Sequence, residues 1–260
     1  MEHDSGAHWA EPFPNHWAGR RQTEDERLLE SVEELETIGR DAWRIFRIMG
    51  EFVEGFEEMA KVGPAVSIFG SARVKPGEPQ YEQCVETARL LGEAGFAIIT
   101  GGGPGIMEAA NKGAKEAGAH SVGCNIELPF EQKGNDYADM SVDFRYFFVR
   151  KTMFVKYSQA FLIFPGGFGT MDELFESLTL IQTGKVRLFP VVMVGKDYWG
   201  GLLEWMREHM AAEGKISARD LDLVFLTDDP KEARDFVVHR LRRRKEILQG
   251  RLPSDWGAEL

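Results

Sequence analysis

Short apolar segments alternate with amphipathic segments over most of the chain. The apolar segments are followed by glycine, proline or polar residues, which predicts buried strands. The amphipathic segments repeat apolar positions at three- and four-residue steps, which predicts helices. The predicted strands are 65–69, 96–100, 120–126, 141–144, 161–164, 188–194 and 223–227, and the predicted helices are 79–94, 104–117, 149–158, 170–183, 199–212 and 230–248.

Short strands that alternate with helices predict an α/β fold. We expect a Rossmann-like, doubly wound, mostly parallel sheet with helices on both faces. Such folds bind ligands at the carboxyl ends of their strands. Three turns fall at that edge, and they begin at Gly70, Gly101 and Pro165.

The first 60 residues lie outside this alternation. Residues 1–22 show no periodicity, and His3, His8 and His16 fit no single helical face, so a flexible arm is favoured over a metal site. From Thr23 to Phe56 apolar residues recur at helical steps, which predicts one helix or a pair that packs on the main domain or on another subunit. We expect an N-terminal extension (1–60), a Rossmann-like domain (61–250) and a tail (251–260).

Composition excludes some classes of function. The formal net charge of the 260-residue chain is −11, which argues against a protein that binds nucleic acid, because such proteins present a basic face. No apolar run is long enough to cross a bilayer, and the N-terminus has no signal-peptide core. We expect a cytoplasmic protein with no membrane partner. Cys84 and Cys124 form no disulfide framework or metal-ligand spacing and are interpreted as packing residues.

The segment Phe161–Glu173 joins an apolar strand to a helix through Pro165, two glycines, Phe168 and Gly169. Backbone N–H groups and the positive end of a helix meet at such a turn, which favours an anion. We expect Thr170 to be the N-cap and Glu173 to stand at the capping-box position. Glu173 either caps its helix only, or adds chemistry beside a bound phosphate.

Gly101–Gly105 opens a helix directly after a strand, which is the setting of a phosphate cradle. The segment lacks the third glycine of the dinucleotide fingerprint and the Gly-Lys-Ser/Thr of a P-loop. We favour the phosphate cradle over the alternative of a tight turn that uses glycine for geometry alone. Arg150 and Lys151 lie at a predicted helix start, where cations are unfavourable, so either an acidic or anionic group faces them or they are a solvated pair.

Three segments resemble one known family: Gly101–Asn111, Arg150–Met153 and Pro165–Glu173. Together they are similar to the motifs of the LOG ("Lonely Guy") family of cytokinin-activating phosphoribohydrolases, formerly mislabelled as lysine decarboxylases. The resemblance covers about residues 63–245. The Gly-Gly-Gly-Pro-Gly turn and the long N-terminal helix resemble the larger bacterial members.

This resemblance implies hydrolysis of the N-glycosidic bond of a nucleoside 5′-monophosphate, which releases the base and ribose 5-phosphate. It implies Arg150 and Glu173 as the catalytic pair, with a nearby carboxylate stabilising the positive charge that develops on the sugar. The expected substrate-binding residues are Ser71, Gly102, Gly103, Glu108, Lys151, Gly166, Gly167, Phe168, Gly169 and Thr170. No metal or redox cofactor is required, and no lysine lies in a recognisable pyridoxal phosphate site.

Two other functions compete with this one. A non-catalytic nucleotide-binding or molybdenum-cofactor carrier protein has similar glycine turns, but it has no reason to place the Glu173 carboxylate beside an anionic ligand. A scaffold that assembles through its N-terminal helix leaves both glycine turns unexplained. We also expect a homo-oligomer, at least a dimer, from the resemblance and from the apolar faces of the segment Thr23–Phe56.

Overall fold

Seven parallel strands form one sheet in the computed structural model, which describes residues 21–29, 37–129 and 134–251. The strand order is β4-β3-β2-β1-β5-β6-β7, and every neighbouring pair is parallel. The strands are β1 Ala65–Phe69, β2 Ala97–Thr100, β3 Ser121–Ile126, β4 Met140–Phe144, β5 Ala160–Ile163, β6 Val191–Val194 and β7 Val224–Thr227. The predicted α/β fold is confirmed.

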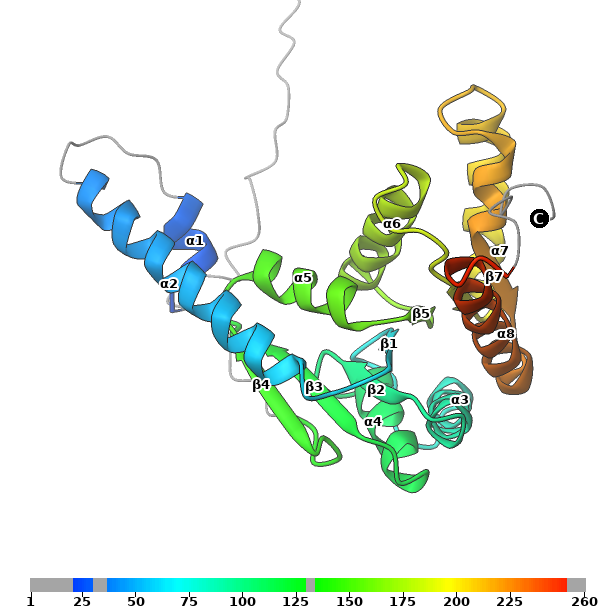
Figure 1. The fold of residues 1–260 in the computed structure, drawn as a ribbon, viewed down its shortest axis with the longest axis horizontal. Helices are drawn as coiled ribbons and strands as arrows, with labels where there is room; N and C mark the ends of the chain where they lie inside the picture. The colour runs from blue at the N-terminus through cyan, green and yellow to red at the C-terminus, as the bar shows by residue number, and fades with distance from the viewer. Residues whose placement is uncertain (1–20, 30–36, 130–133, 252–260) are drawn as a thin grey trace, which may run out of the picture.

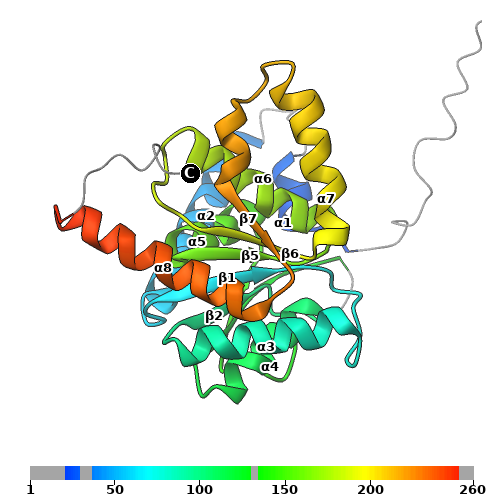
Figure 2. The same ribbon diagram turned by 90° about the vertical axis from the view of Figure 1, so that its right-hand side faces the viewer.

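Helices cover both faces of the sheet (Figure 1). They are α1 Glu24–Leu29, α2 Thr37–Met59, α3 Pro79–Glu93, α4 Ile106–Glu116, α5 Phe147–Tyr157, α6 Phe168–Gln182, α7 Lys196–Trp205 and α8 Pro230–Leu248, with a π-helical stretch η1 (Met206–Ala211) and a 3-10 helix η2 (Ala218–Leu223). Figure 2 shows α3 and α4 on one side of the sheet and α6 and α7 on the other. The alternation along β1 divides the core, because Val66 and Ile68 face α3 and α4 whereas Phe69 faces α5.

The topology places a crevice next to β1. The chain runs outward from β1 through β2, β3 and β4, then returns to β5 on the other side of β1 and runs outward again. The direction of winding therefore reverses between β1 and β5. Ligands of doubly wound sheets bind at this switch point, outside the carboxyl ends of the strands.

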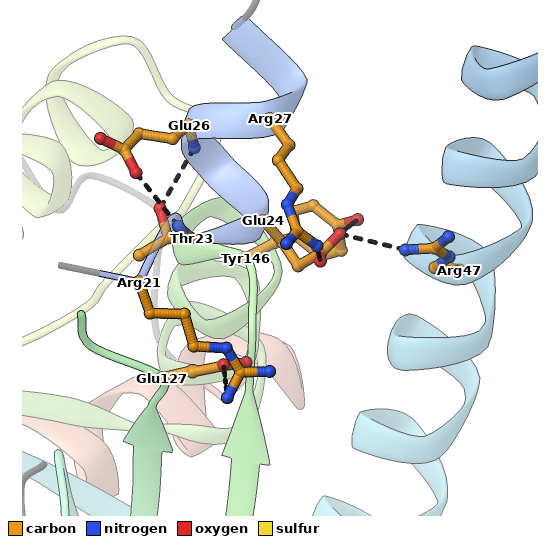
Figure 3. A network of polar contacts seen from close by, with 8 residues as sticks. All are labelled: Arg21, Thr23, Glu24, Glu26, Arg27, Arg47, Glu127 and Tyr146. Carbon is orange, nitrogen blue, oxygen red and sulfur yellow. Dashed lines mark hydrogen bonds and ion pairs between the residues drawn. The ribbon is translucent and has the colours of Figure 1, made fainter. Parts of the chain in front are cut away.

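The described N-terminal helices pack on the edge of the domain beside α5. Gly55 of α2 lets this helix approach closely, since an added Cβ would lie 2.9 Å from Met153 Cε and 3.0 Å from Phe144 Cε1. The Tyr157 hydroxyl, at the end of α5, donates to the carbonyl of Phe56 at 3.0 Å. Figure 3 shows α1 beside α2, with Glu24 accepting from Arg47 at 3.2 Å. The prediction that this segment packs on the main domain is confirmed for these helices.

The predicted elements are confirmed in type and order, whereas several boundaries differ. Strand β6 begins at Val191 rather than at residue 188, because Pro190 has no N–H for a ladder and Leu188 is left-handed (φ 57°). The last part of the predicted helix 199–212 is the π-helical η1. The predicted arm with His3, His8 and His16, and residues 252–260 of the tail, lie outside the described residues.

Candidate active site

A cavity of about 1000 Å³ lies at the carboxyl edge of the sheet. Its walls come from the turns after β1, β2 and β3 and from the first turns of α5 and α6. Backbone hydrogen bonds join the three predicted turns, because Ser71 N donates to Pro165 O at 2.9 Å and Ser71 O accepts from Ile106 N at 3.0 Å. Ser71, Gly102 and Gly103 all line the cavity, as predicted from the positions of their turns.

Glu173 lies in this lining and is 7% exposed. Burial raises the pKa of its carboxyl to about 7, the charge of Lys151 acts in the opposite direction, and Glu176 raises the pKa again. Within the described residues, Glu173 Oε2 has no hydrogen-bond partner. A buried carboxyl that is about half ionised near neutral pH, with one oxygen that accepts no hydrogen bond from the described residues, is suited to acid–base chemistry or to charge stabilisation.

Arg150 reaches the same cavity from the first turn of α5. Its Nε donates to Cys124 O at 2.8 Å and its Nη2 donates to Gly101 O at 3.4 Å. The guanidinium also lies over the Phe154 ring, 5.1 Å from the ring centroid. Burial lowers the pKa of Arg150 and the charge of Glu173 raises it, so the predicted catalytic pair is brought together and is coupled through charge.

Gly101 makes room for Arg150, since a Cβ there would collide with the Arg150 guanidinium and with Met107 Sδ. Gly102 adopts a left-handed conformation (φ 72°), and a Cβ on it would collide with Asn125 Oδ1. Glycine in this turn therefore serves close approach as well as backbone geometry.

A buried polar network supports this glycine turn. Thr100 Oγ1 accepts from Gly102 N at 3.0 Å and donates to Asn111 Oδ1 at 2.6 Å. Asn111 Nδ2 in turn donates to Ser121 Oγ at 2.8 Å. Thr100, Asn111 and Ser121 are fully buried, and a satisfied buried network of this kind fixes the shape of the turn.

The first turn of α6 forms another wall of the cavity. The helix begins at Phe168 with Gly167 as N-cap, and no side chain caps it. The prediction of Thr170 as N-cap with Glu173 at the capping-box position is therefore wrong, because the helix starts at the glycines rather than after them. The first N–H groups of a helix have no partner within the helix, and the first turn of α6 carries no acid. Gly167, Phe168, Gly169 and Thr170 line the cavity, so the start of α6 presents to it the features that favour an anion.

Three predicted substrate-binding residues do not line the cavity: Glu108, Lys151 and Gly166. Glu108 Oε1 accepts from the Tyr81 hydroxyl of α3 at 2.9 Å, and Gly166 O accepts from the Tyr198 hydroxyl at 2.6 Å. Gly166 instead lets Thr170 pack beneath the turn, since a Cβ there would collide with Thr170 Oγ1.

Lys151 joins α5 to α6. Its Nζ lies 2.9 Å from Asp172 Oδ1 and 3.2 Å from Glu176 Oε2. The prediction that an acidic group faces the cation pair at the start of α5 is confirmed for Lys151. Asp172 and Glu176 lie on either side of Glu173 in α6. Their ion pairs with Lys151 therefore connect α6 to α5, the helix that carries Arg150.

Polar residues at the ends of β3 and β4 also line the cavity and were missed in the sequence. Asn125 Nδ2 donates to Asp143 Oδ1 at 2.8 Å, and Arg145 follows β4. Their position at the carboxyl ends of predicted strands was the signal that could have found them.

Comparisons with known proteins place the chain in a family. A family model described as "Possible lysine decarboxylase" matches residues 107–237. A Mycobacterium tuberculosis protein named cytokinin riboside 5′-monophosphate phosphoribohydrolase is 30% identical over 164 residues, which cover 60% of this chain and 86% of that protein. The chain belongs to the LOG family. An Arabidopsis thaliana LOG protein of the same name is 28% identical and covers 63% of this chain and 76% of its own length.

Solved structures support the α/β fold. A molybdenum cofactor binding protein from Rippkaea orientalis gives a TM-score of 0.51 at 21% identity and covers 68% of this chain and 97% of its own. A molybdenum cofactor carrier protein from Chlamydomonas reinhardtii gives 0.51 at 22% identity, with 69% and 98% covered. At these identities the likeness shows the α/β fold alone.

The LOG motifs surround the cavity. Gly101–Gly103, Arg150 and Gly167–Thr170 all line it together with Glu173. None of the described helices is long and apolar enough to span a membrane. In the described part of the chain no group of His, Cys, Asp or Glu side chains is arranged to hold a metal ion.

Proposed function

We propose that this LOG-family protein hydrolyses the N-glycosidic bond of a nucleoside 5′-monophosphate, a cytokinin riboside monophosphate or AMP. In this reaction the bond between the sugar C1′ and the base nitrogen breaks, water supplies the hydroxyl group on C1′, and the base nitrogen receives a proton. The observation that carries the proposal is the buried Glu173 carboxyl, which belongs to a residue that lines the cavity beside the first turn of α6 and whose Oε2 has no hydrogen-bond partner among the described residues. The names of the relatives support the same reaction.

The phosphate group is assigned to the first turn of α6. The backbone N–H groups there, the positive end of the helix dipole and the absence of acids in that turn favour a dianion. A phosphate held at Gly167–Thr170 brings the attached ribose toward Glu173, because Gly167–Thr170 and Glu173 line the same cavity.

Glu173 is assigned to the sugar. Departure of the base leaves positive charge on the ring, and an ionised carboxylate close to C1′ stabilises that charge or orients the attacking water. A pKa of about 7 gives a carboxylate that is more basic than an exposed glutamate and that still ionises at neutral pH.

Arg150 is assigned to contact the ligand and to place its positive charge near Glu173. Its hydrogen bonds to Cys124 O and Gly101 O leave it fixed at the cavity wall. A fixed cation needs little reorganisation when negative charge arrives, which is the condition under which electrostatic stabilisation is most effective.

The test is chromatography of products after incubation of the full chain with AMP and with isopentenyladenosine monophosphate. We expect free base from the wild type, and a loss of about 100-fold or more in kcat for Glu173→Gln. Glu204→Gln, on the exposed side of α7, is the matched control and should keep its activity.

A faster release of base from the isopentenyl substrate would assign cytokinin production. Binding of both monophosphates without release of base from either would overturn the proposal and favour a carrier protein. Equal activity of Glu173→Gln and the wild type would remove Glu173 from the chemistry.

A further inference from the structure

The turn before α6 contains three successive carbonyl groups that each accept a hydrogen bond within the protein. The two outer carbonyls, of Pro165 and Gly167, accept from backbone N–H groups at 2.9 and 3.0 Å. The middle carbonyl, of Gly166, accepts from the Tyr198 hydroxyl of α7 at 2.6 Å. Tyr198 is therefore the side chain that holds the middle peptide unit of this turn, whereas backbone groups hold the units on either side.

The N–H groups of the same three peptide units belong to Gly166, Gly167 and Phe168. In the described part of the chain no residue accepts a hydrogen bond from any of them. The described peptide bonds are all trans, so the C=O and the N–H of one unit point in opposite directions. A turn whose carbonyls are all bonded within the protein presents its N–H groups on the other side, which is the arrangement that binds anions.

The middle peptide unit joins two glycines, Gly166 and Gly167, and no side chain of its own limits its rotation. Gly167 has a φ of −89°, and a Cβ built on it meets nothing within 4 Å. If this unit were reversed, it would present a carbonyl oxygen instead of an N–H to the cavity that Gly167 lines. A phosphate group would then meet an acceptor, so the orientation of this unit matters for an anionic ligand.

The start of α7 is fixed against the turn, which places the Tyr198 hydroxyl. Gly195, the N-cap of α7, packs on Pro165, since an added Cβ there would lie 3.1 Å from Pro165 Cγ. Trp199 is fully buried, and its indole N–H donates to a carbonyl of β6 at 3.1 Å. Neither Tyr198 nor Gly166 lines the cavity, so their hydrogen bond lies outside it.

We propose that Tyr198 is a positioning residue for the phosphate group of the ligand. Its hydroxyl holds the Gly166 carbonyl away from the cavity and thereby directs the Gly167 N–H into it. The hydrogen bond also polarises the peptide unit, which makes the N–H a stronger donor. This inference rests on one part of the proposed function, the assignment of the phosphate to the first turn of α6.

The proposal predicts an effect on phosphate-bearing ligands alone. Without the Tyr198 hydroxyl, the fraction of molecules in which the Gly167 N–H faces the cavity falls, and the apparent affinity for a phosphate group falls in proportion. The loss of one neutral hydrogen bond of this kind corresponds to about a tenfold decrease in affinity. A nucleoside without a phosphate does not use this N–H, so its affinity should not change.

The first test is isothermal titration calorimetry of Tyr198→Phe with AMP and with adenosine. All proteins in this test are full-length and carry Glu173→Gln, so that AMP is not consumed. We expect the dissociation constant of AMP to rise about tenfold and that of adenosine to stay the same. Tyr157→Phe is the matched control, because it also removes a hydroxyl that donates to a backbone carbonyl, that of Phe56 at 3.0 Å, and it should change neither constant.

Each other result of the titration overturns a defined part of the inference. An unchanged affinity of Tyr198→Phe for AMP, or an equal loss for AMP and adenosine, would overturn the positioning role, while release of base by the wild type would still support the proposed hydrolysis. Equal affinities of the parent protein for AMP and adenosine would overturn the phosphate assignment itself. Circular dichroism checks that Tyr198→Phe and Tyr157→Phe keep the fold.

The second test observes the Gly167 N–H directly by nuclear magnetic resonance of protein labelled with ¹⁵N-glycine. The Gly167 signal is assigned by its loss in Gly167→Ala. We expect ribose 5-phosphate to shift the Gly167 amide proton downfield in the wild type, and to shift it less in Tyr198→Phe at the same concentration. A Gly167 amide that does not respond in the wild type, or that responds equally in Tyr198→Phe, would overturn the proposal.

Discussion

The Glu51 carboxylate of α2 accepts a hydrogen bond of 3.0 Å from the backbone N–H of Tyr146, the N-cap residue of α5. The same oxygen accepts from Arg145 N at 3.0 Å, and Glu51 is only 6% exposed. Asp25 of α1 accepts from Phe147 N at 3.2 Å. The N-terminal extension thus supplies the carboxylates that cap α5, and α5 carries Arg150.

Glu51→Ala removes the acceptor of two backbone N–H groups at the start of α5. We expect the free energy of unfolding to fall by about 1–3 kcal/mol and kcat for release of base to fall because Arg150 is less well held. Glu51→Gln keeps an acceptor oxygen and should recover most of both quantities. Urea denaturation and steady-state kinetics measure them, and an unchanged stability of Glu51→Ala would contradict this role.

The pKa of Glu173 predicts opposite effects of pH on stability and activity. The carboxyl has a pKa of 4.5 in the unfolded reference and about 7 in the folded protein, so the folded state binds more protons between these values. The stability of the folded state therefore falls as pH rises through this range, by about 1.4 kcal/mol for each pH unit. The rate of base release should instead rise as pH passes about 7, because the ionised form is the active one.

Glu173→Gln should separate the two effects. The amide does not ionise, so the variant should be more stable than the wild type by up to about 3 kcal/mol above pH 7 and similar to it near pH 4, while its activity is lost. Thermal unfolding at both pH values measures the difference. Equal melting temperatures at high pH would show that Glu173 is not held in a destabilised ionised state.

Gly101→Ala places a methyl group where the Arg150 guanidinium and Met107 Sδ now lie. Because Arg150 must move, we expect kcat to fall by about 10-fold or more with a smaller effect on stability. Gly200→Ala in α7 is the matched control, since an added Cβ there meets nothing within 4 Å, and it should be neutral or slightly stabilising. Full activity of Gly101→Ala would mean that the position of Arg150 is not critical.

Lys151→Met removes the cation that most strongly lowers the pKa of Glu173. The pKa should therefore move above its present value of about 7, and the rising limb of the pH–rate profile should shift in the alkaline direction. Lys156→Met, on the same helix with its ammonium over the Phe56 ring, is the control. A profile that does not move would indicate that Lys151 acts only as a structural link to Asp172 and Glu176.

The fold could be predicted from the sequence because its signals are local. Apolar runs such as Ala65–Phe69 and Val191–Val194 are buried on both faces of a parallel sheet, so each one is visible as a strand without its neighbours. The turns at Gly70, Gly101 and Pro165 follow strands, and parallel strands bring their carboxyl ends to one edge. A shared pocket at this edge was therefore predicted from the positions of the turns, and the resemblance to the LOG motifs added Arg150 and Glu173 as a pair, which both line the cavity.

The contacts between distant residues could not be predicted in this way. Glu108 was assigned to a ribose hydroxyl, whereas the Tyr81 hydroxyl of α3 occupies its Oε1. Thr170 was assigned as N-cap, whereas the helix begins at Phe168 and Thr170 packs beneath Gly166. To assign Glu108 and Thr170 correctly, one has to know which residues of other elements lie next to them. The spacing of residues along the chain does not contain this information.

The sequence by itself determined the order of strands and helices along the chain, the edge of the sheet that carries the cavity, and most of the residues that line it among those predicted to bind substrate. Only the tertiary structure decided that Glu51 of α2 caps α5, that Lys151 joins the helices of Arg150 and Glu173, and that burial raises the Glu173 pKa to about 7. The physical reason is that strand and helix formation depends on neighbouring residues in the chain, whereas desolvation, capping between helices and ion pairing depend on groups that folding brings together from distant positions.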